Sequence, residues 1–255
     1  MNEVTRYERR GQAGWITLAS PQTRNALSAE VVAGLAAHLR EAIADPAVRA
    51  VVLTGEGPAF CAGADLKNRA ASGESGQGNP FVGILREMRH GPKPVIAAVN
   101  GQAFGGGVGL VAAADIAIAA DTAVFSFSEV RIGVIPAMIS VVVLPKLGEH
   151  QTMRLFLTGE RFDAARALGY GLLHRVVPPD RLSAAVQEEI DAIARGGPNA
   201  VREAKQLVRA VGRLPEDEAY RFAEKKIATL FASEEAAEGM AAFAQKRAPR
   251  WVHSE

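Results

Sequence analysis

Short apolar runs separated by mixed polar segments fill the first 130 residues of the chain. Their length and apolar character predict strands, some buried on both faces, at 14–19, 50–54, 95–99, 116–119 and 123–127. Helices are expected between strands, one after Ser28 and one over about 108–114. Strands that alternate with helices predict an α/β fold with a largely parallel sheet.

The helix after Ser28 has the clearest pattern. Its apolar positions recur at helical spacing: Val31, Leu35, Leu39 and Ile43. Ser28 is a preferred N-cap residue, and Asp45-Pro46 ends the helix because the residue before proline avoids helical backbone angles.

The pattern becomes mainly helical after about residue 150. Helices are predicted at 150–157, 163–168, 180–194, 198–211, 215–230 and from Ser233 to about 247, whereas only 172–177 looks extended. A glycine-rich boundary at Gly196-Gly197-Pro198 divides the chain into an α/β core over residues 1–196 and a C-terminal helical region over 197–255. The segment 67–79 is small, polar and glycine-rich, so we expect either a mobile loop bordering a binding site or a tolerated insertion.

Composition excludes several classes of function. The 255 residues contain 29 Lys+Arg and 28 Asp+Glu, and this balance gives no reason to expect nucleic acid or an acidic membrane surface as a partner. The single Cys61 excludes a disulfide within the chain and a zinc site built on several cysteines. The five histidines lack paired ligand spacing, so no metal site is expected. A charged N-terminus and the lack of a long apolar run predict a cytoplasmic protein.

Two glycine-containing turns are the candidates for chemistry. They are Ala62-Gly63-Ala64-Asp65 and Gly105-Gly106-Gly107, each after a predicted buried strand. Glycine allows close approach to a ligand, and two unpaired N–H groups aimed at one point would form an oxyanion hole; alternatively, both are only tight turns. The second turn also suggests a dinucleotide site, but its G-x-G-x-G spacing puts Leu110 where the fingerprint has glycine, which leaves NAD binding a remote alternative.

Ordered motifs along the chain resemble those of the crotonase (enoyl-CoA hydratase/isomerase) family. They are Phe60-Cys61-Ala62-Gly63-Ala64-Asp65-Leu66-Lys67, Asn100-Gly101-Gln102-Ala103-Phe104-Gly105-Gly106-Gly107, Ser128-Glu129-Val130-Arg131-Ile132-Gly133-Val134-Ile135-Pro136 and the tail 238–247. This resemblance implies a spiral of ββα units with a C-terminal helical appendage that serves oligomerisation. It also implies an acyl-CoA thioester as the substrate, no separate cofactor, and assembly into a homotrimer or hexamer.

The resemblance also assigns roles within the site. The N–H groups of Ala64 and Gly106 would hold the thioester oxygen, and Glu129 would move protons. A second catalytic glutamate of the family falls on Gly109 and is missing here. One carboxylate could still add water across the double bond, or shuttle a proton as an isomerase does, and Glu74 could replace the missing group.

A weakly catalytic acyl-CoA-binding protein is another alternative. The branch of bacterial methylglutaconyl-CoA and enoyl-CoA hydratases resembles this chain in having glycine at the same place, which favours hydration.

The CoA part would lie along residues of the two turns and of the tail: Ala62, Ala64, Asp65, Leu66, Lys67, Gly106, Phe243 and Lys246. The tail pair would come from a neighbouring subunit, and Lys67 could instead be a solvated lysine.

Overall fold

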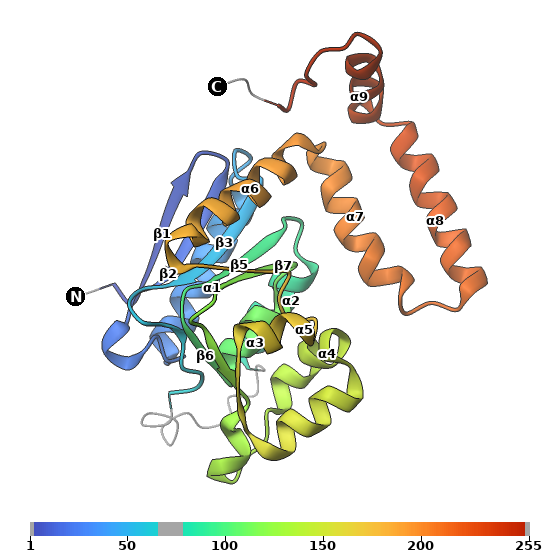
Figure 1. The fold of residues 1–255 in the computed structure, drawn as a ribbon. Coiled ribbons are helices and arrows are strands. Elements are labelled where there is room, and N and C mark those ends of the chain that lie inside the picture. The colour runs from blue at the N-terminus through green and yellow to red at the C-terminus, as the bar shows by residue number, and fades with distance from the viewer. Residues whose placement is uncertain (1–2, 66–78, 253–255) are drawn as a thin grey trace.

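Two sheets form the centre of the computed structural model, which describes residues 3–65 and 79–252 (Figure 1). The larger sheet has the order β1 (Thr5–Arg10), β2 (Ala13–Leu18), β3 (Ala50–Gly55), β5 (Val95–Val99), β7 (Ile116–Ala120), β10 (Arg175–Val177). The smaller sheet has the order β4 (Ala59–Cys61), β6 (Gln102–Phe104), β8 (Val124–Ser126), β9 (Arg161–Asp163). All neighbouring strands are parallel except β1–β2 and β8–β9, so the prediction of a largely parallel α/β fold is confirmed.

Two strands followed by a helix recur along the chain. The helices that close successive units are α1 (Ala29–Ala44), α2 (Pro80–His90), α3 (Gly106–Ala113) and α4 (Ala137–Thr158). In each unit the first strand joins the larger sheet and the second joins the smaller one, except in the first unit, where both join the larger sheet. This repetition is the expected spiral of ββα units.

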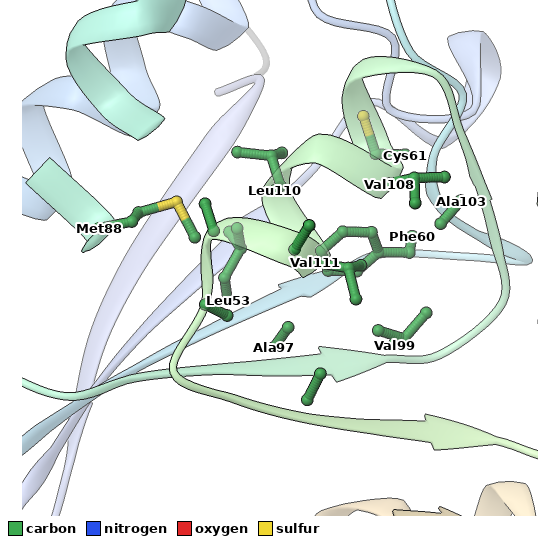
Figure 2. Close-up of a cluster of buried hydrophobic side chains, with 14 of the residues drawn as sticks. Leu53, Phe60, Cys61, Met88, Ala97, Val99, Ala103, Val108, Leu110 and Val111 are labelled. Atoms are coloured by element: carbon green, nitrogen blue, oxygen red, sulfur yellow. The ribbon is translucent and has the colours of Figure 1, made fainter. Parts of the chain in front are cut away.

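The core lies between the larger sheet and the helices α2 and α3. Figure 2 shows Leu53 and Ala97 from the sheet facing Met88 of α2 and Val111 of α3, with Phe60 beside them. All five are almost completely buried. Strands β3 and β5 are apolar on both faces because helix α6 (Leu182–Arg195) covers the other side.

Helix α1 forms as its pattern predicts. The Ser28 hydroxyl oxygen accepts a hydrogen bond from the N–H of Val31, which satisfies one of the unpaired donors of the first turn. Val31, Leu35 and Leu39 are buried against the sheet, and the helix stops at Ala44 before Pro46.

Several short strands could not be predicted from the sequence pattern. Strands β4, β6 and β9 have three residues each, too few for a period to show. The expectation that only 172–177 is extended after residue 150 is therefore wrong, since β9 pairs antiparallel with β8. Helix α4 starts at Ala137, far before the predicted residue 150. A break in the helix at Gly148 (φ +70°) divides it into two parts, and the prediction covered only the second part.

Helices continue as far as Ala244: α5 (Ala164–Gly169), α6, α7 (Pro198–Val211), α8 (Glu216–Phe231) and α9 (Glu234–Ala244). Figure 1 shows α7, α8 and α9 extending away from the two sheets, and neither α7 nor α8 has a fully buried residue. Val208 and Phe231 are 74% and 63% exposed, although both are large and apolar. In the described ranges, every helix is too short or too polar to cross a membrane.

Candidate active site

The two glycine-containing turns meet in space. Gly63 has a φ of +88°, and its carbonyl oxygen accepts a hydrogen bond of 2.7 Å from the N–H of Leu27. A methyl group placed on Gly63 would lie 2.7 Å from the carbonyl oxygen of Phe104 and 3.4 Å from the amide nitrogen of Gly106. The left-handed angle and this close approach both require glycine. The N–H of Ala64, the next residue, is thereby brought beside the start of α3.

The second turn is equally tight. Gly105 has a φ of +49° and donates its N–H to the carbonyl oxygen of Ser126 at 2.9 Å. A methyl group on Gly106 would overlap Leu27 Cδ1 at 2.6 Å. Among the hydrogen bonds formed within the described ranges, none uses the N–H of Ala64 or Gly106 as its donor. Within the described residues, two donors therefore stand unpaired at one place, one of them at a helix N-terminus.

The side chain of Glu129 lies against the second of these turns, at Gly105. It belongs to the short 3-10 helix Ser128–Ile132 that follows β8. A methyl group on Gly105 would lie 2.8 Å from Glu129 Oε1 and 3.3 Å from its Cδ, so the carboxylate covers the glycine directly. Its Oε2 is buried and has no hydrogen-bond partner in the part of the chain that the structure describes.

Burial raises the pKa of the Glu129 carboxyl, and a hydrogen bond from its own backbone N–H opposes this only in part. Among the described residues, Glu129 forms no ion pair with the neighbouring Arg131. A carboxyl with a raised pKa beside two N–H donors can move a proton to or from a carbon next to a carbonyl. The donors can stabilise the oxygen anion that forms, and losing one such donor typically costs about 3–4 kcal/mol of barrier height.

Gly109 lies one turn further along α3, where its N–H donates to the carbonyl oxygen of Gly105. A methyl group at this position would overlap the side chain of Ile139, whose Cβ would be 2.9 Å away and whose Cγ2 would be closer still. Ile139 is 3% exposed and belongs to α4. The site therefore has no room for a second carboxylate from this direction.

The remaining predicted binding residues lie in two places. Ala62 donates its N–H to the carbonyl oxygen of Arg24 at 2.9 Å, and Ala64 is exposed, which leaves its N–H accessible. Asp65 follows directly and is half-buried. The predictions for Leu66, Lys67 and Glu74 lie outside the described residues.

Phe243 and Lys246 are not brought to the turns within one chain. Phe243 is 88% exposed on α9, and Lys246 follows that helix with a left-handed φ of +53°. Figure 1 shows α9 well apart from α3, beyond α7 and α8. If these side chains contact a ligand at the turns, the turns must belong to another copy of the chain.

Other residues support the site without a clear signal in the sequence. Asn25 is completely buried, and its side chain donates to the carbonyl oxygens of Ala59 and Glu56 and accepts from the N–H of Ser20. These hydrogen bonds hold β4 in position, and β4 leads into the first turn. Its own φ of +57°, unusual for a residue with a side chain, is apparent only in the fold. Leu27 and Phe81 flank Gly106, and neither stands out in the apolar pattern.

Cys61 is buried beside Gly107 and takes no visible part in chemistry. Burial raises the pKa of its thiol to about 12, so the reactive thiolate is not populated near neutral pH. Across residues 3–65 and 79–252, no three side chains of His, Cys, Asp or Glu converge as a metal site requires.

The fold and these turns define a class of protein, and comparison with known proteins agrees. The chain belongs to the enoyl-CoA hydratase/isomerase (crotonase) family, whose model matches residues 8–254. Members of this family act on acyl-CoA thioesters.

Several individual relatives and solved structures are similar to the chain over nearly its whole length. The chain is 40% identical to a probable enoyl-CoA hydratase of Rhizobium meliloti over 98% of each chain. It is 38% identical to the carnitinyl-CoA dehydratase of Citrobacter koseri over 98% of this chain and 99% of that one. Among solved structures, an enoyl-CoA hydratase/isomerase from Marinobacter aquaeolei superposes with a TM-score of 0.92 at 35% identity, covering 98% of this chain and all of the other. Pseudomonas aeruginosa AtuE gives a TM-score of 0.92 at 36% identity with the same coverage.

Proposed function

We propose that this protein is an enoyl-CoA hydratase that uses one glutamate. The reaction adds water across the 2,3 double bond of a 2-enoyl-CoA thioester. The observation that carries the proposal is the position of the Glu129 carboxylate against Gly105, in the turn that also holds Gly106 and packs against Gly63-Ala64. The names of the relatives from Rhizobium and Citrobacter support chemistry of this type, since a dehydratase runs the same reaction in reverse.

The mechanism follows from the chemistry of a thioester. The N–H groups of Ala64 and Gly106 hold the thioester oxygen. The Glu129 carboxylate takes a proton from water while the water oxygen bonds to C3, and the π electrons move onto the thioester oxygen as an enolate. The protonated Glu129 then returns its proton to C2, and the 3-hydroxyacyl-CoA is complete. Atoms and charge balance with one carboxyl group, because the proton that it removes is the proton that it gives back.

The raised pKa of Glu129 suits both halves of this cycle. A base whose conjugate acid has a pKa nearer neutrality is stronger as a base, and the acid that it becomes still gives up its proton readily. The pKa of Glu129 is raised because its buried Oε2 is removed from water.

An enoyl-CoA isomerase is the second candidate, and the contact between Gly109 and Ile139 favours it. Isomerisation moves a proton between C2 and C4 and needs only one base. A hydratase with two acidic groups can share the work of activating water and protonating carbon, whereas this chain has no space for the second group at residue 109.

Coenzyme A binding completes the proposal. The CoA part would follow Ala62, Asp65, Leu66 and Lys67 from the first turn. Phe243 and Lys246 would come from a second copy, because α9, which carries Phe243 and precedes Lys246, is distant from the turns of its own chain. Residues 197–255 would then form the oligomerisation region of a cytoplasmic homotrimer or hexamer. Light scattering at several protein concentrations tests this assembly, and a monomer throughout would contradict it.

The test of the activity is hydration of crotonyl-CoA by the wild type, Glu129→Gln and Glu188→Gln, with the product identified. Glu188 is an exposed glutamate on α6, so its variant controls for the loss of a carboxylate alone. We expect 3-hydroxybutyryl-CoA from the wild type and the control, and a loss of about 10²–10⁴-fold in Glu129→Gln.

The outcomes separate the candidates. Turnover of a 3-enoyl-CoA to the 2-enoyl isomer without hydration would establish the isomerase instead. Tight binding of crotonyl-CoA without any turnover would identify a binding protein and overturn both enzymatic functions.

A further inference from the structure

A cluster of basic side chains lies between α2, α4 and α7. Its cations are Arg89, Lys146, Lys205, Arg209 and Arg213, with His90 at the margin. The carboxylates that face them in the described part of the chain are Asp115 and Glu87. Five cations thus share two carboxylates, in a protein whose overall charge is nearly neutral.

The cluster is separate from the candidate active site. Asp115 immediately precedes β7, whereas the catalytic turns follow the carboxyl ends of β4 and β6 in the other sheet. Helix α2 connects the two places: Phe81 at its start lies beside Gly106, and Arg89 lies near its end. At 1.5 Å per residue, the rise from Phe81 to Arg89 is roughly 12 Å along the helix.

Some of the charged groups in the cluster already have hydrogen-bond partners within the chain. The Asp115 carboxylate accepts bonds from Lys205 Nζ at 2.8 Å, Arg209 Nη2 at 3.1 Å and the N–H of Val95 at 2.8 Å. Lys205 also donates to the carbonyl oxygens of Met88 and Lys93, so its three protons are all used. Asp115 has little capacity left for the other cations.

Among the cations in the described residues, Arg89 is the one with a buried nitrogen that lacks a hydrogen-bond partner. Arg89 is 7% exposed, and its Nη1 donates to the carbonyl oxygen of Val141, but its Nε is buried with no partner among the described residues. Lys146 donates to the carbonyl oxygen of Ala114. Burial is the main cause that lowers the pKa of Lys146 to about 8, and the neighbouring Arg209 and Arg89 lower it further.

Unbalanced buried cations destabilise a fold unless an anion compensates them. Among the cations, Arg213 is exposed and Lys146 and Arg209 are partly exposed, so solvent reaches the cluster on their side. Guanidinium groups bind tetrahedral oxyanions with paired hydrogen bonds, which gives the site a chemical preference.

We propose that Arg89, Lys146 and Arg209 bind a small polyvalent oxyanion of the phosphate class, at a site independent of the acyl-CoA site. Arg213 and His90 lie at its mouth, and Asp115 orients Arg209. Occupancy would tie α2, α4 and α7 together and raise the stability of the folded chain.

The experiment measures thermal unfolding against inorganic phosphate, with sodium chloride at matched ionic strength as the reference. Saturating coenzyme A is present throughout, so that sites for its own phosphates are already filled. We expect a saturating rise in melting temperature for the wild type. Arg89→Met should weaken the apparent phosphate affinity by about tenfold or more, since a charge-assisted hydrogen bond is lost. Arg40→Met, at an exposed arginine of α1, removes the same charge elsewhere and should leave the affinity unchanged.

Arg213→Met keeps the test informative if Arg89→Met does not fold, because Arg213 is exposed and its replacement should fold normally. It should weaken phosphate binding several-fold. An equal response in Arg40→Met and Arg213→Met, or a rise that never saturates, would overturn the proposal. Val141 and Val208 are exposed near the cluster, so a second copy could supply carboxylates instead. A change of oligomeric mass in Arg213→Met together with no phosphate binding by the wild type would establish that outcome and reject the anion site.

Discussion

The side chain of Ile139 occupies the space that any side chain at Gly109 would need. The two residues come from α4 and α3, which pack against each other beside the turn at Gly105 and Gly106. Ile139 is almost completely buried, so it cannot move aside without opening a cavity. The packing of the two helices therefore leaves no room for a carboxylate at residue 109.

Gly109→Ala should destabilise the protein by about 1–3 kcal/mol, because the added methyl overlaps Ile139. Gly83→Ala is the matched control: Gly83 lies within α2 with nothing near its added methyl, and alanine should stabilise that helix by up to about 1 kcal/mol. Urea unfolding measures both changes. Equal effects of the two substitutions would show that the contact with Ile139 has no energetic weight.

The same contact predicts coupling between the two positions. Ile139→Ala alone should cost about 2–5 kcal/mol through the cavity that it leaves. In the double variant Gly109→Ala/Ile139→Ala, the new methyl enters that cavity, so the cost should be clearly less than the sum of the single costs. Additive costs within about 0.5 kcal/mol would mean that the two side chains do not share this space.

Gly63→Ala should lower kcat/KM for an enoyl-CoA substrate by about 10²–10³-fold, the usual effect of losing an oxyanion donor. The added methyl would press on the carbonyl oxygen of Phe104 and force the turn, with the N–H of Ala64, out of line with Gly106. Gly11→Ala controls for backbone strain, since Gly11 has a φ of +55° but an open surrounding. Steady-state kinetics should find Gly11→Ala fully active, and equal losses in both would attribute the effect to strain alone.

Glu129→Gln should be more stable than the wild type at neutral pH. A carboxyl whose pKa is raised by folding favours the protonated folded state, so its ionisation costs stability as the pH rises through that pKa. Glutamine resembles the neutral form and avoids this cost. The stability advantage of the variant should disappear below the ordinary pKa of glutamate, about 4.3. Thermal unfolding between pH 4 and pH 8 provides the measurement, and a variant less stable than the wild type at pH 7 would contradict the burial argument.

The pH dependence of the reaction should agree with this stability profile. The base must be ionised, so kcat/KM should rise with pH and reach its plateau above the ordinary glutamate range. An acid limb at or below the ordinary value would exclude Glu129 as the base.

Glu238→Gln should loosen the segment that follows α9. The Glu238 carboxylate accepts bonds from Arg247 Nη1 and Nη2 and from the N–H of Arg250, and this pairing lowers the pKa of Glu238 to about 2. Because the folded pKa is depressed, this contribution is present above the ordinary pKa of glutamate and is lost as the pH falls towards 2. Hydrogen exchange at neutral pH should be faster around Arg247 in the variant, with Glu234→Gln, in the first turn of the same helix, as the control. Unchanged exchange would mean that Glu238 does not hold the segment.

The long elements were predictable because their patterns are local. Strands β3 and β5 are continuous apolar runs, and α1 has an N-cap and a regular apolar stripe. The three-residue strands β4 and β6 carry no period of their own, yet they position both glycine-containing turns. Their pairing depends on contacts between segments some 40 residues apart, which no local window contains.

The sequence by itself determined the α/β class, the family through its ordered motifs, the two glycine turns and the absence of a carboxylate at residue 109. Only the tertiary structure decided that Gly63 and Gly106 touch, that Ile139 closes the space beside Gly109, and that the basic side chains of α2, α4 and α7 gather around Asp115. The physical reason is that backbone propensity and hydrophobic periodicity act over neighbouring residues. Close packing and the balance of buried charge depend instead on segments that folding brings together from distant parts of the chain.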